Sequence, residues 1–582
     1  MAISLSNRTT NIAACCLLIF VFFVTVFSLK DDSLTMDEVA HLPAGYSYLT
    51  QKDMRLNPEH PPLLKDLAAL PLLFIKDIKF PSEISSWQTE VNSQWDFGRY
   101  FLYQTGNPTD KMIFWGRIPM ILVLILLGFY IFKWTRELFG NGAALLALFL
   151  FSFSPTFLAH GRLVTTDVGA AFGAVFATYY FIKALQVPTK KNIILAGLAF
   201  GVSQLLKFSL ILLLPLFGLM ILVWWLTKSG TFLPTLKIGF FIFLIGFILI
   251  WPVYQYHVWN YPAEKQLADA QVYLKDTIKP LKTIILWASD KPIIRAYAQY
   301  FTGLSMIFHR VAGGNTTYFL GEVSNLGWRN YFPLVYLIKE PLAFHLLTLI
   351  ALLFALGLIR FRHGFGGQIK DWLKSHFTEF SLLAFIVLYW LVSIQGNLNI
   401  GIRHLLPVFP FTMILVSAMT IKSLLKESYL KLKYGFLLLL ILWQVFSVVS
   451  IYPHFLAYFN ELAGGPNQGY RYVVDSNLDW GQDLKRLSQW VEDNGIGEIY
   501  VDYFGGDSPA YRLGKKYSPW WGTRNPVELP ARSYLAVSAT YLQGGRGKRV
   551  SDYQGPDSYY LWLDNYTPIA KIGYSIFIYQ LR

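Results

Sequence analysis

The sequence has 582 residues, of which 54% are hydrophobic and only 15% charged, and its formal net charge is +14. A soluble protein of this length rarely has so apolar a composition, and the apolar residues gather in long runs, which excludes a soluble globular class. The Lys and Arg residues mostly separate these runs, so membrane topology accounts for the positive charge better than a nucleic-acid surface does. The adjacent Cys15 and Cys16 indicate neither a disulfide framework nor a metal site.

Eleven apolar runs have the length expected of membrane-spanning helices. Such a helix needs about 20 residues, and somewhat fewer where the protein tilts or the bilayer thins. The first run resembles a signal-peptide core but has no small-residue cleavage pattern before Lys30, so we interpret it as an uncleaved first span. The predicted spans are 12–29, 112–132, 142–158, 166–182, 192–206, 209–226, 238–257, 341–359, 378–394, 404–421 and 434–452.

Basic residues gather in alternate connections between these spans. Placing those connections in the cytoplasm, with the N-terminus, satisfies the positive-inside rule and indicates a multi-pass protein of the plasma membrane. The loops 30–111 and 258–340 and the tail after residue 453 are then extracytoplasmic. The basic residues that decide this orientation are Lys133, Arg136, Lys183, Lys190, Lys191, Lys228, Lys237, Arg360, Arg362, Lys370, Lys374, Lys422, Lys426, Lys431 and Lys433.

The tail differs from the rest of the chain in its pattern. Runs at 499–504, 533–540 and 559–563 are rich in strand-forming residues and are separated by Gly, Pro and Asp, while 482–492 has helical spacing. The sequence therefore predicts an α-helical polytopic membrane protein with about eleven transmembrane helices, an extracytoplasmic loop region and a small C-terminal α/β domain. The expected domains are 1–453, with outer loops 30–111 and 258–340, and 454–582.

Carboxylates gather in the short outer connections. Asp37 and Glu38 follow the first span, and Asp167 opens the fourth, where apolar sequence begins at once. An ionisable group at membrane depth is costly to keep and is a candidate for function. The alternative for Asp167 is a charge at a helix N-terminus, stabilised by the helix dipole and capped by Thr165 or Thr166.

Cations are expected on the same face. Arg162 precedes Asp167, Lys207 interrupts an apolar stretch, and Arg403 and His404 precede the tenth span. Each of them could simply extend to the membrane interface. Together with the carboxylates, they suggest a site that holds a phosphate and accepts a proton, since Arg and Lys bind phosphoryl oxygens and a carboxylate can deprotonate a hydroxyl.

Short motifs in these outer connections resemble the protein O-mannosyltransferase family. They also resemble the wider group of polytopic, GT-C-type glycosyltransferases that use polyprenyl-phosphate sugars, including lipid A aminoarabinose transferases and bacterial phospholipid-carrier-dependent enzymes. His60 stands where the aminoarabinose transferases have a Lys, and the 258–340 loop lacks an obvious inserted domain of the eukaryotic mannosyltransferase type. The matching residues are Asp37-Glu38, Glu59-His60-Pro61-Pro62-Leu63 with Lys65, Thr166-Asp167, and the segments GIRHLLPVFP and DSNLDWGQDL.

This resemblance implies an inverting transfer of a sugar from a polyprenyl-phosphate carrier to a hydroxyl of a protein, lipid or glycan. Asp37 would be the base, Glu38 would hold the acceptor or the site geometry, and Asp167 would orient the acceptor or a cation. Glu59 and His60 would contact the donor or hold a divalent metal. The phosphate candidates are Lys65, Arg162, Lys207, Arg403 and His404.

A lipid-linked donor also has a physical rationale. Nucleotide sugars stay in the cytoplasm, and the sequence has no glycine-rich phosphate motif bounded by strands. The leaving lipid phosphate is a stable anion, so one carboxylate suffices, in contrast to the two of glycoside hydrolysis. Two alternatives remain open: a transporter or flippase of a lipid-linked saccharide, and a non-catalytic subunit whose tail recruits a partner. Transporters usually bury charge near the midplane and show paired repeats, whereas here the charges gather at one face.

Overall fold

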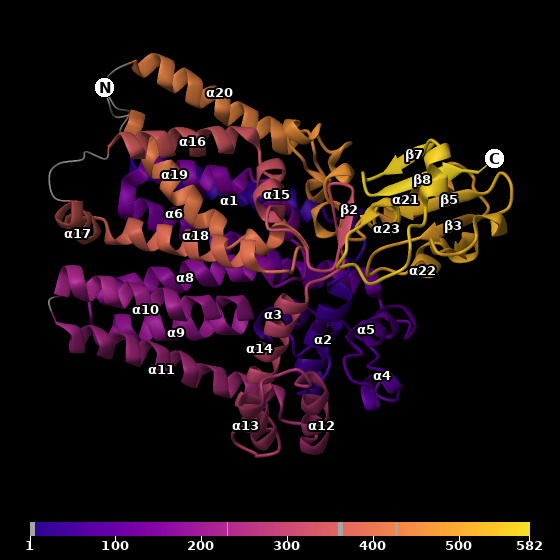
Figure 1. Ribbon diagram of the computed structural model, residues 1–582, viewed down its shortest axis with the longest axis horizontal. Helices are drawn as coiled ribbons and strands as arrows, with labels where there is room; N and C mark the ends of the chain where they lie inside the picture. The colour runs from indigo at the N-terminus through magenta and orange to yellow at the C-terminus, as the bar shows by residue number, and fades with distance from the viewer. Residues whose placement is uncertain (1–5, 230, 359–364, 425–428, 582) are drawn as a thin grey trace.

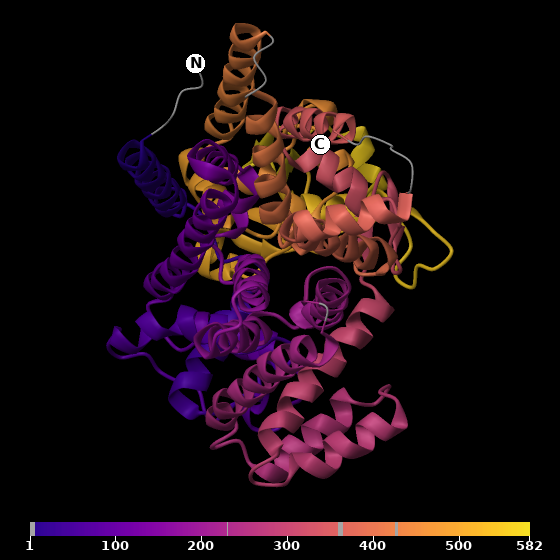
Figure 2. The same ribbon diagram turned by 90° about the vertical axis from the view of Figure 1, so that its left-hand side faces the viewer.

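The computed structural model describes residues 6–581 apart from 230, 359–364 and 425–428. Helices packed side by side form a bundle, and the C-terminal region covers one end of it (Figure 1). Figure 2 shows the molecule from the end at which the N-terminus lies. Arg360, Arg362 and Lys426, three of the residues used to assign the orientation, lie outside the described residues.

Seven helical stretches of the described chain are long and apolar enough to cross a membrane. The helical, multi-pass class predicted from the sequence is therefore confirmed. The seven are α1 (Asn7–Phe27), α6 (Thr109–Ser152), α8 (Asp167–Gln186), the stretch Phe208–Thr227 that contains η2 (Phe208–Leu212) and α10 (Leu213–Trp224), α11 (Phe232–His257), α18 (Phe377–Gln395) and α20 (Leu430–Val449).

Other predicted spans coincide with shorter or bent helices. α9 (Lys190–Leu206) and α19 (Val408–Leu424) have 17 residues each. α15 (Tyr331–Lys339) and α16 (Leu342–Gly357) meet at a bend of 112° and would give an eighth crossing if they act as one span. The number of eleven membrane spans stays a prediction.

The long helix α6 covers the predicted span 112–132 and the first part of the predicted span 142–158. At Gly140 the backbone has φ +81° and ψ −177°, so two helices meet there at a kink. A positive φ is open to glycine at little energetic cost, which explains the residue at this point. The second span ends early, at Ser152, and α7 (Pro155–His160) continues the run as a separate short helix.

The outer connections fold into helices of their own, at the same end of the bundle as the C-terminal region (Figure 1). α17 (Phe365–Ser375) lies at the opposite end. The two long loops and the tail therefore share one end of the bundle, and their extracytoplasmic placement stays a prediction. The loop elements are α2 (Glu38–Gln51), α3 (Leu63–Ala69), α4 (Ser85–Gln88), α5 (Gln94–Tyr103), α12 (Ala263–Tyr273), α13 (Lys279–Ser289), α14 (Arg295–Gly313), β1 (Thr317–Phe319) and β2 (Glu322–Ser324).

The C-terminal region has a five-stranded mixed sheet in the order β4-β3-β5-β8-β7. β3 pairs in parallel with β4 and β5, and β8 pairs antiparallel with β5 and β7. Apolar residues of α21, among them Leu484 and Leu487, pack on the sheet residues Ile499, Val501 and Ile578. The elements are α21 (Leu484–Asp493), β3 (Ile499–Asp502), α22 (Pro509–Leu513), β4 (Tyr517–Pro519), β5 (Tyr534–Ser538), α23 (Ala539–Arg546), β6 (Lys548–Arg549), β7 (Ala570–Ile572) and β8 (Ile576–Gln580).

The tail predictions are confirmed in part. Strands form in the first two predicted runs, and a helix forms close to the predicted position. The third run, 559–563, is not a strand: Tyr560 has φ +63° and precedes the 3₁₀ helix η11 (Leu561–Asn565). The Tyr560 hydroxyl donates a hydrogen bond to Asp502, so this residue is held by its side chain rather than by a strand ladder.

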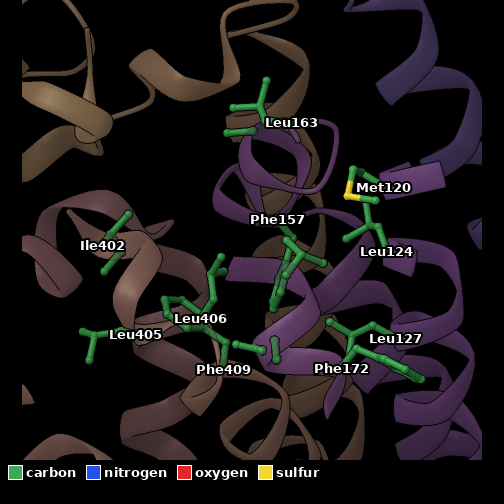
Figure 3. Packing of buried hydrophobic residues seen from close by; sticks show 14 of the residues in the cluster. Met120, Leu124, Leu127, Phe157, Leu163, Phe172, Ile402, Leu405, Leu406 and Phe409 are labelled. Carbon is green, nitrogen blue, oxygen red and sulfur yellow. The ribbon is translucent and has the colours of Figure 1, made fainter. Parts of the chain in front are cut away.

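Buried apolar side chains pack directly behind the loop that carries Arg403. Figure 3 shows Phe157 of α7 and Phe409 of α19 beside Leu406, with Leu124 of α6 close by. These side chains are fully buried, which fixes the 3₁₀ helix η4 (Ile402–Leu405) against the membrane helices. The core therefore gives the polar residues of η4 a rigid support.

Candidate active site

A cavity of about 90 Å³ lies at the meeting point of six segments of the chain. These are the start of α2, the 57–60 loop, the start of α8, the end of α9, α14 and the 398–404 loop. Both long loops and the ends of membrane helices contribute residues to its wall. All but three of the predicted site residues line the cavity, and cations lie next to carboxylates around it. Its charged and imidazole residues are Asp37, His41, Glu59, His60, Asp167, Lys207, Arg310, Arg403 and His404.

Asp37 stands at the N-cap position of α2 but makes no capping hydrogen bond with its side chain. Its main-chain carbonyl accepts hydrogen bonds from backbone nitrogens of the first helical turn, including one of 3.0 Å from the His41 nitrogen. The carboxylate is thus free to face the cavity, where Oδ2 accepts a hydrogen bond of 2.7 Å from Arg403 Nη1. The Asp37 side chain is 19% exposed, against 1% for Asp167.

Arg403 joins two carboxylates. The same Nη1 that contacts Asp37 lies 3.3 Å from Asp167 Oδ2, and the other oxygen of Asp167 lies 2.5 Å from Lys207 Nζ. Lys207 reaches this position because α9 ends there, with an extended backbone before η2 begins. The result is a continuous chain of alternating charges in which each buried carboxylate has a cation, as burial of charge requires.

The cavity lining also carries a second ion pair and two imidazoles. Glu59 Oε2 lies 3.0 Å from Arg310 Nη1 of α14. The rings of His41 and His60 meet edge to face at 5.2 Å, and burial holds the pKa of both imidazoles below the usual value. Two imidazole nitrogens of the cavity lining, His60 Nδ1 and His404 Nε2, are buried and have no hydrogen-bond partner among the described residues. These atoms are available to a ligand.

Three predicted site residues, Glu38, Arg162 and Lys65, lie outside the cavity lining. Glu38 accepts hydrogen bonds from Arg117 at 2.6 and 2.8 Å and from the Thr35 and Val164 nitrogens, so it joins the loop before α2 to α6 and to the loop before α8. Arg162 forms a buried ion pair of 2.7 Å with Asp32. The positions of Glu38 and Arg162 are those of structural residues, because the charge of each side chain is neutralised by a buried partner.

Lys65 is also buried away from the cavity lining. Its ammonium group donates to the Asn57 side chain at 2.7 Å and to the main-chain carbonyls of Asn57 and His60 at 2.8 Å each. Burial lowers the pKa of Lys65 to about 7. Instead of contacting a phosphate directly, Lys65 ties down the loop that presents Glu59 and His60.

The residues around Glu59 and His60 do not fit a metal site. Glu59 is neutralised by Arg310, and the described part of the chain contains no group of three or more His, Cys, Asp or Glu side chains arranged to hold a metal ion. The divalent metal expected near these two residues has no support in this geometry.

Sequence reasoning missed several residues of the site. His41 and Arg310 line the cavity, and Ser476 and Trp480 of the tail contact Arg403. The pattern of α14 gives no signal for Arg310, because an arginine in an amphipathic helix is ordinarily a solvated residue. The two tail residues lie in DSNLDWGQDL, a segment whose resemblance to known enzymes is its main signal.

Comparison with known proteins gives one family match. Residues 109–251 match the family of dolichyl-phosphate-mannose-protein mannosyltransferases. The resemblance expected from the sequence is therefore confirmed, and the matched region contains Asp167 and Lys207. No curated protein matches the chain.

Several solved structures resemble this one at low identity. The Archaeoglobus fulgidus oligosaccharyltransferase in its apo form has a TM-score of 0.46 and 12% identity, over 92% of this chain and 71% of that one. ArnT from Cupriavidus metallidurans in the apo state has a TM-score of 0.34 and 11% identity, over 99% and 98%. The S. cerevisiae Pmt1-Pmt2 complex bound to its sugar donor has a TM-score of 0.34 and 18% identity, over 45% and 35%. Since these TM-scores lie below 0.5, the function proposed below depends on the site itself and on the family match.

Proposed function

We propose that the protein is an inverting glycosyltransferase that moves a sugar from a polyprenyl-phosphate carrier to a hydroxyl acceptor. The observation that carries this proposal is the chain Asp37–Arg403–Asp167–Lys207 in a cavity at one end of the membrane helices. It offers a partly exposed carboxylate next to two fixed cations. The family match supports the donor class, because dolichyl phosphate mannose is a sugar on a lipid phosphate.

Asp37 acts as the base in this proposal. Its carboxylate takes the proton of the acceptor hydroxyl as the acceptor oxygen bonds to the anomeric carbon. The bond from that carbon to the phosphate oxygen breaks on the opposite face, and its electron pair leaves with the lipid phosphate. The leaving group is a stable anion, so no general acid is needed.

Lys207 and Arg403 stabilise the phosphate as negative charge develops on it, with His404 contributing a buried imidazole nitrogen. Fixed cations in a site with little water stabilise a developing charge without having to reorganise. Asp167 holds both cations in place. Glu59, His60 and Arg310 also line the cavity, and they bind the sugar or the remaining phosphate oxygens.

The acceptor is a protein, lipid or glycan hydroxyl in this proposal, and transfer takes place at the outer face of the plasma membrane. The N-terminus is then cytoplasmic and the tail extracytoplasmic. Lipids of the bilayer surround the apolar helices, and the carrier chain reaches the cavity from that phase.

The test uses the full-length protein in proteoliposomes with a panel of polyprenyl-phosphate sugars, and measures release of the free carrier phosphate. Asp37→Asn is expected to lower the rate by at least about 100-fold, the usual contribution of a positioned base. Asp31→Asn, an exposed carboxylate in the same loop, is the matched control and keeps the rate. Full activity of Asp37→Asn, or translocation of the intact donor without release of its carrier, would overturn the proposal.

A further inference from the structure

The tail segment 475–482 packs against the two loops that carry Arg403 and Asp37. It begins with η8 (Asp475–Asn477), and Ser476, Asn477 and Trp480 are buried to 1% exposure or less. Burial of this degree in a polar segment requires that its hydrogen-bonding groups find partners. Those partners lie in two loops that are distant from each other in sequence.

One group of contacts holds the loop of Arg403. Ser476 Oγ accepts a hydrogen bond of 3.1 Å from Arg403 Nε and donates one to the Ile400 carbonyl. The indole of Trp480 lies under the guanidinium, 4.3 Å from its central carbon. At Gly401, where φ is positive, an added Cβ would clash with Ser476 Oγ, so only glycine allows this approach.

The other group holds the loop that precedes Asp37. The Trp480 carbonyl accepts a hydrogen bond of 3.0 Å from the Met36 nitrogen, and the Gln482 carbonyl accepts one of 2.8 Å from the Ser33 nitrogen. Trp480 therefore contacts Arg403 with its ring and the residue next to Asp37 with its backbone. Residues 475–482 therefore contact both Arg403 and the loop that leads to Asp37.

We infer that residues 475–482 position the active site: Ser476 and Trp480 set the place of the Arg403 guanidinium relative to the Asp37 carboxylate. This inference rests on the proposed function. Arginine has many rotamers and would otherwise sample orientations that release one carboxylate or the other. Ser476 fixes its Nε edge and Trp480 fixes its plane, which leaves the Nη1 edge toward Asp37 and Asp167. The tail thereby takes part in transfer without touching the substrate.

The test compares matched pairs of full-length variants in the carrier-release assay. Ser476→Ala and Trp480→Leu are each expected to lower kcat by about 10-fold or more, the scale of a hydrogen bond to a charged group or of a desolvated cation–π contact. Trp480→Phe keeps an aromatic face and is expected to restore most of the rate. Ser488→Ala and Trp521→Leu are the controls, since Ser488 also donates to a carbonyl and Trp521 also stacks on an arginine, Arg524, away from the cavity.

Thermal unfolding of each variant separates positioning from folding. If Trp480 has a positioning role, Trp480→Leu should have a low kcat although its unfolding temperature is the same as that of Trp480→Phe. The inference is wrong if Ser476→Ala and Trp480→Leu lose activity only in proportion to their loss of folded protein. It is also wrong if these two variants keep the wild-type kcat. If the wild-type protein releases no carrier from any donor, the proposed function fails first, so the two failures are distinct.

A second inference comes independently from α13, whose 11 residues are too few to span a membrane. Its apolar side chains Leu281, Ile284 and Trp287 recur every three residues and are exposed along one side of the helix. α13 packs on α14, and α14 lies along α11. Trp251 of that membrane helix also donates a hydrogen bond of 2.7 Å to the carbonyl of Ile293, just before α14 begins. Figure 2 shows these helices at the edge of the molecule.

We propose that the exposed apolar face of α13 lies in the headgroup region of the bilayer. The helix is held beside the membrane helix α11 through α14, and Lys279 and Lys282 lie on the side of α13 that faces away from Ile284. An apolar face accompanied by basic residues is typical of a helix that lies in the membrane surface. This placement would fix the outer loop relative to the lipid from which the donor enters.

Spin labels test the placement without an activity assay. A label at Ile284 is compared with one at Lys282, about 200° away on the helix, after Cys15 and Cys16 are replaced by serine. In lipid vesicles, the measured quantity is the ratio of collisions with oxygen to collisions with a water-soluble nickel complex. This ratio is expected to be at least about 5-fold higher for the Ile284 label than for the Lys282 label, as lipid contact requires. Equal ratios at both positions, or spin–spin broadening from a second copy of the chain, would contradict the proposal.

Discussion

The carboxylate of Asp37 accepts a hydrogen bond of 2.7 Å from the guanidinium of Arg403, although 366 positions separate the two residues in the chain. The contact joins the loop after the first membrane helix to the loop before α19. It also brings the proposed base within one side chain of Asp167, which Arg403 contacts at 3.3 Å.

Arg403→Lys is expected to lower kcat/KM for the lipid-linked donor by about 10-fold to 100-fold. A lysine keeps the charge, but its compact ammonium group cannot contact two carboxylates and stack on Trp480 at the same time. The measurement is carrier release at varied donor concentration. Arg524→Lys is the control, because Arg524 also stacks on a tryptophan but lies in the tail, away from the cavity lining. Unchanged kinetics for Arg403→Lys would show that the guanidinium geometry is not needed.

Arg310→Gln is expected to raise the KM for the donor by about 10-fold with a smaller effect on kcat. Arg310 is 37% exposed at the cavity wall and pairs with Glu59, so it can attract an anionic donor without touching the Asp37 end of the site. Raising the ionic strength should weaken this contribution, because salt screens exposed charge. Arg329→Gln, an exposed arginine of the same loop region, should leave KM unchanged. A fall in kcat alone would contradict this role.

Glu38→Gln is expected to destabilise the protein by about 3–5 kcal/mol, because it leaves Arg117 as a buried charge without a carboxylate partner. Thermal unfolding of the detergent-solubilised protein measures the effect. Adding Arg117→Met should recover part of the loss, since the two residues are coupled. Asp96→Asn removes an exposed partner 3.5 Å from Arg99 and should change stability by less than about 0.5 kcal/mol. Equal effects at Glu38 and Asp96 would argue against the buried pair.

Asp479→Asn is expected to stabilise the protein at alkaline pH. Burial raises the pKa of Asp479 to about 8, and the carboxyl group accepts a hydrogen bond from the Thr540 nitrogen, with Asp483 and Asp475 nearby. The folded protein therefore holds a proton that the unfolded chain releases near pH 4, so this group's contribution falls as pH rises from about 4 to about 8.

Asn keeps the acceptor for Thr540 and carries no charge, so the stability of the Asp479→Asn variant should change less over that range. Unfolding temperatures of both proteins from pH 5 to pH 9 measure the difference. It should grow with pH and reach on the order of a few kcal/mol. Asp493→Asn, at an exposed site of α21, should follow the wild-type curve. A constant difference across the pH range would contradict the proposed proton.

The sequence by itself determined the membrane class, most of the helices and most of the charged residues that line the cavity. Runs of apolar residues predict spans because the bilayer requires every backbone group to bond within its own helix, which is a local condition. The positions of Asp37, Asp167, Lys207, Arg403 and His404 at the ends of such runs placed them near one face. These positions alone therefore predict that the five side chains belong to one site.

Only the tertiary structure decided which charges meet. Arg162 and Glu38 have the same kind of position in sequence as Arg403 and Asp37, yet each is neutralised by a buried partner, Asp32 or Arg117. A buried charge must find its partner in three dimensions, and sequence spacing does not encode which one is close. For the same reason the contributions of Arg310 and Trp480 could be recognised only when α14 and the tail were folded against the cavity.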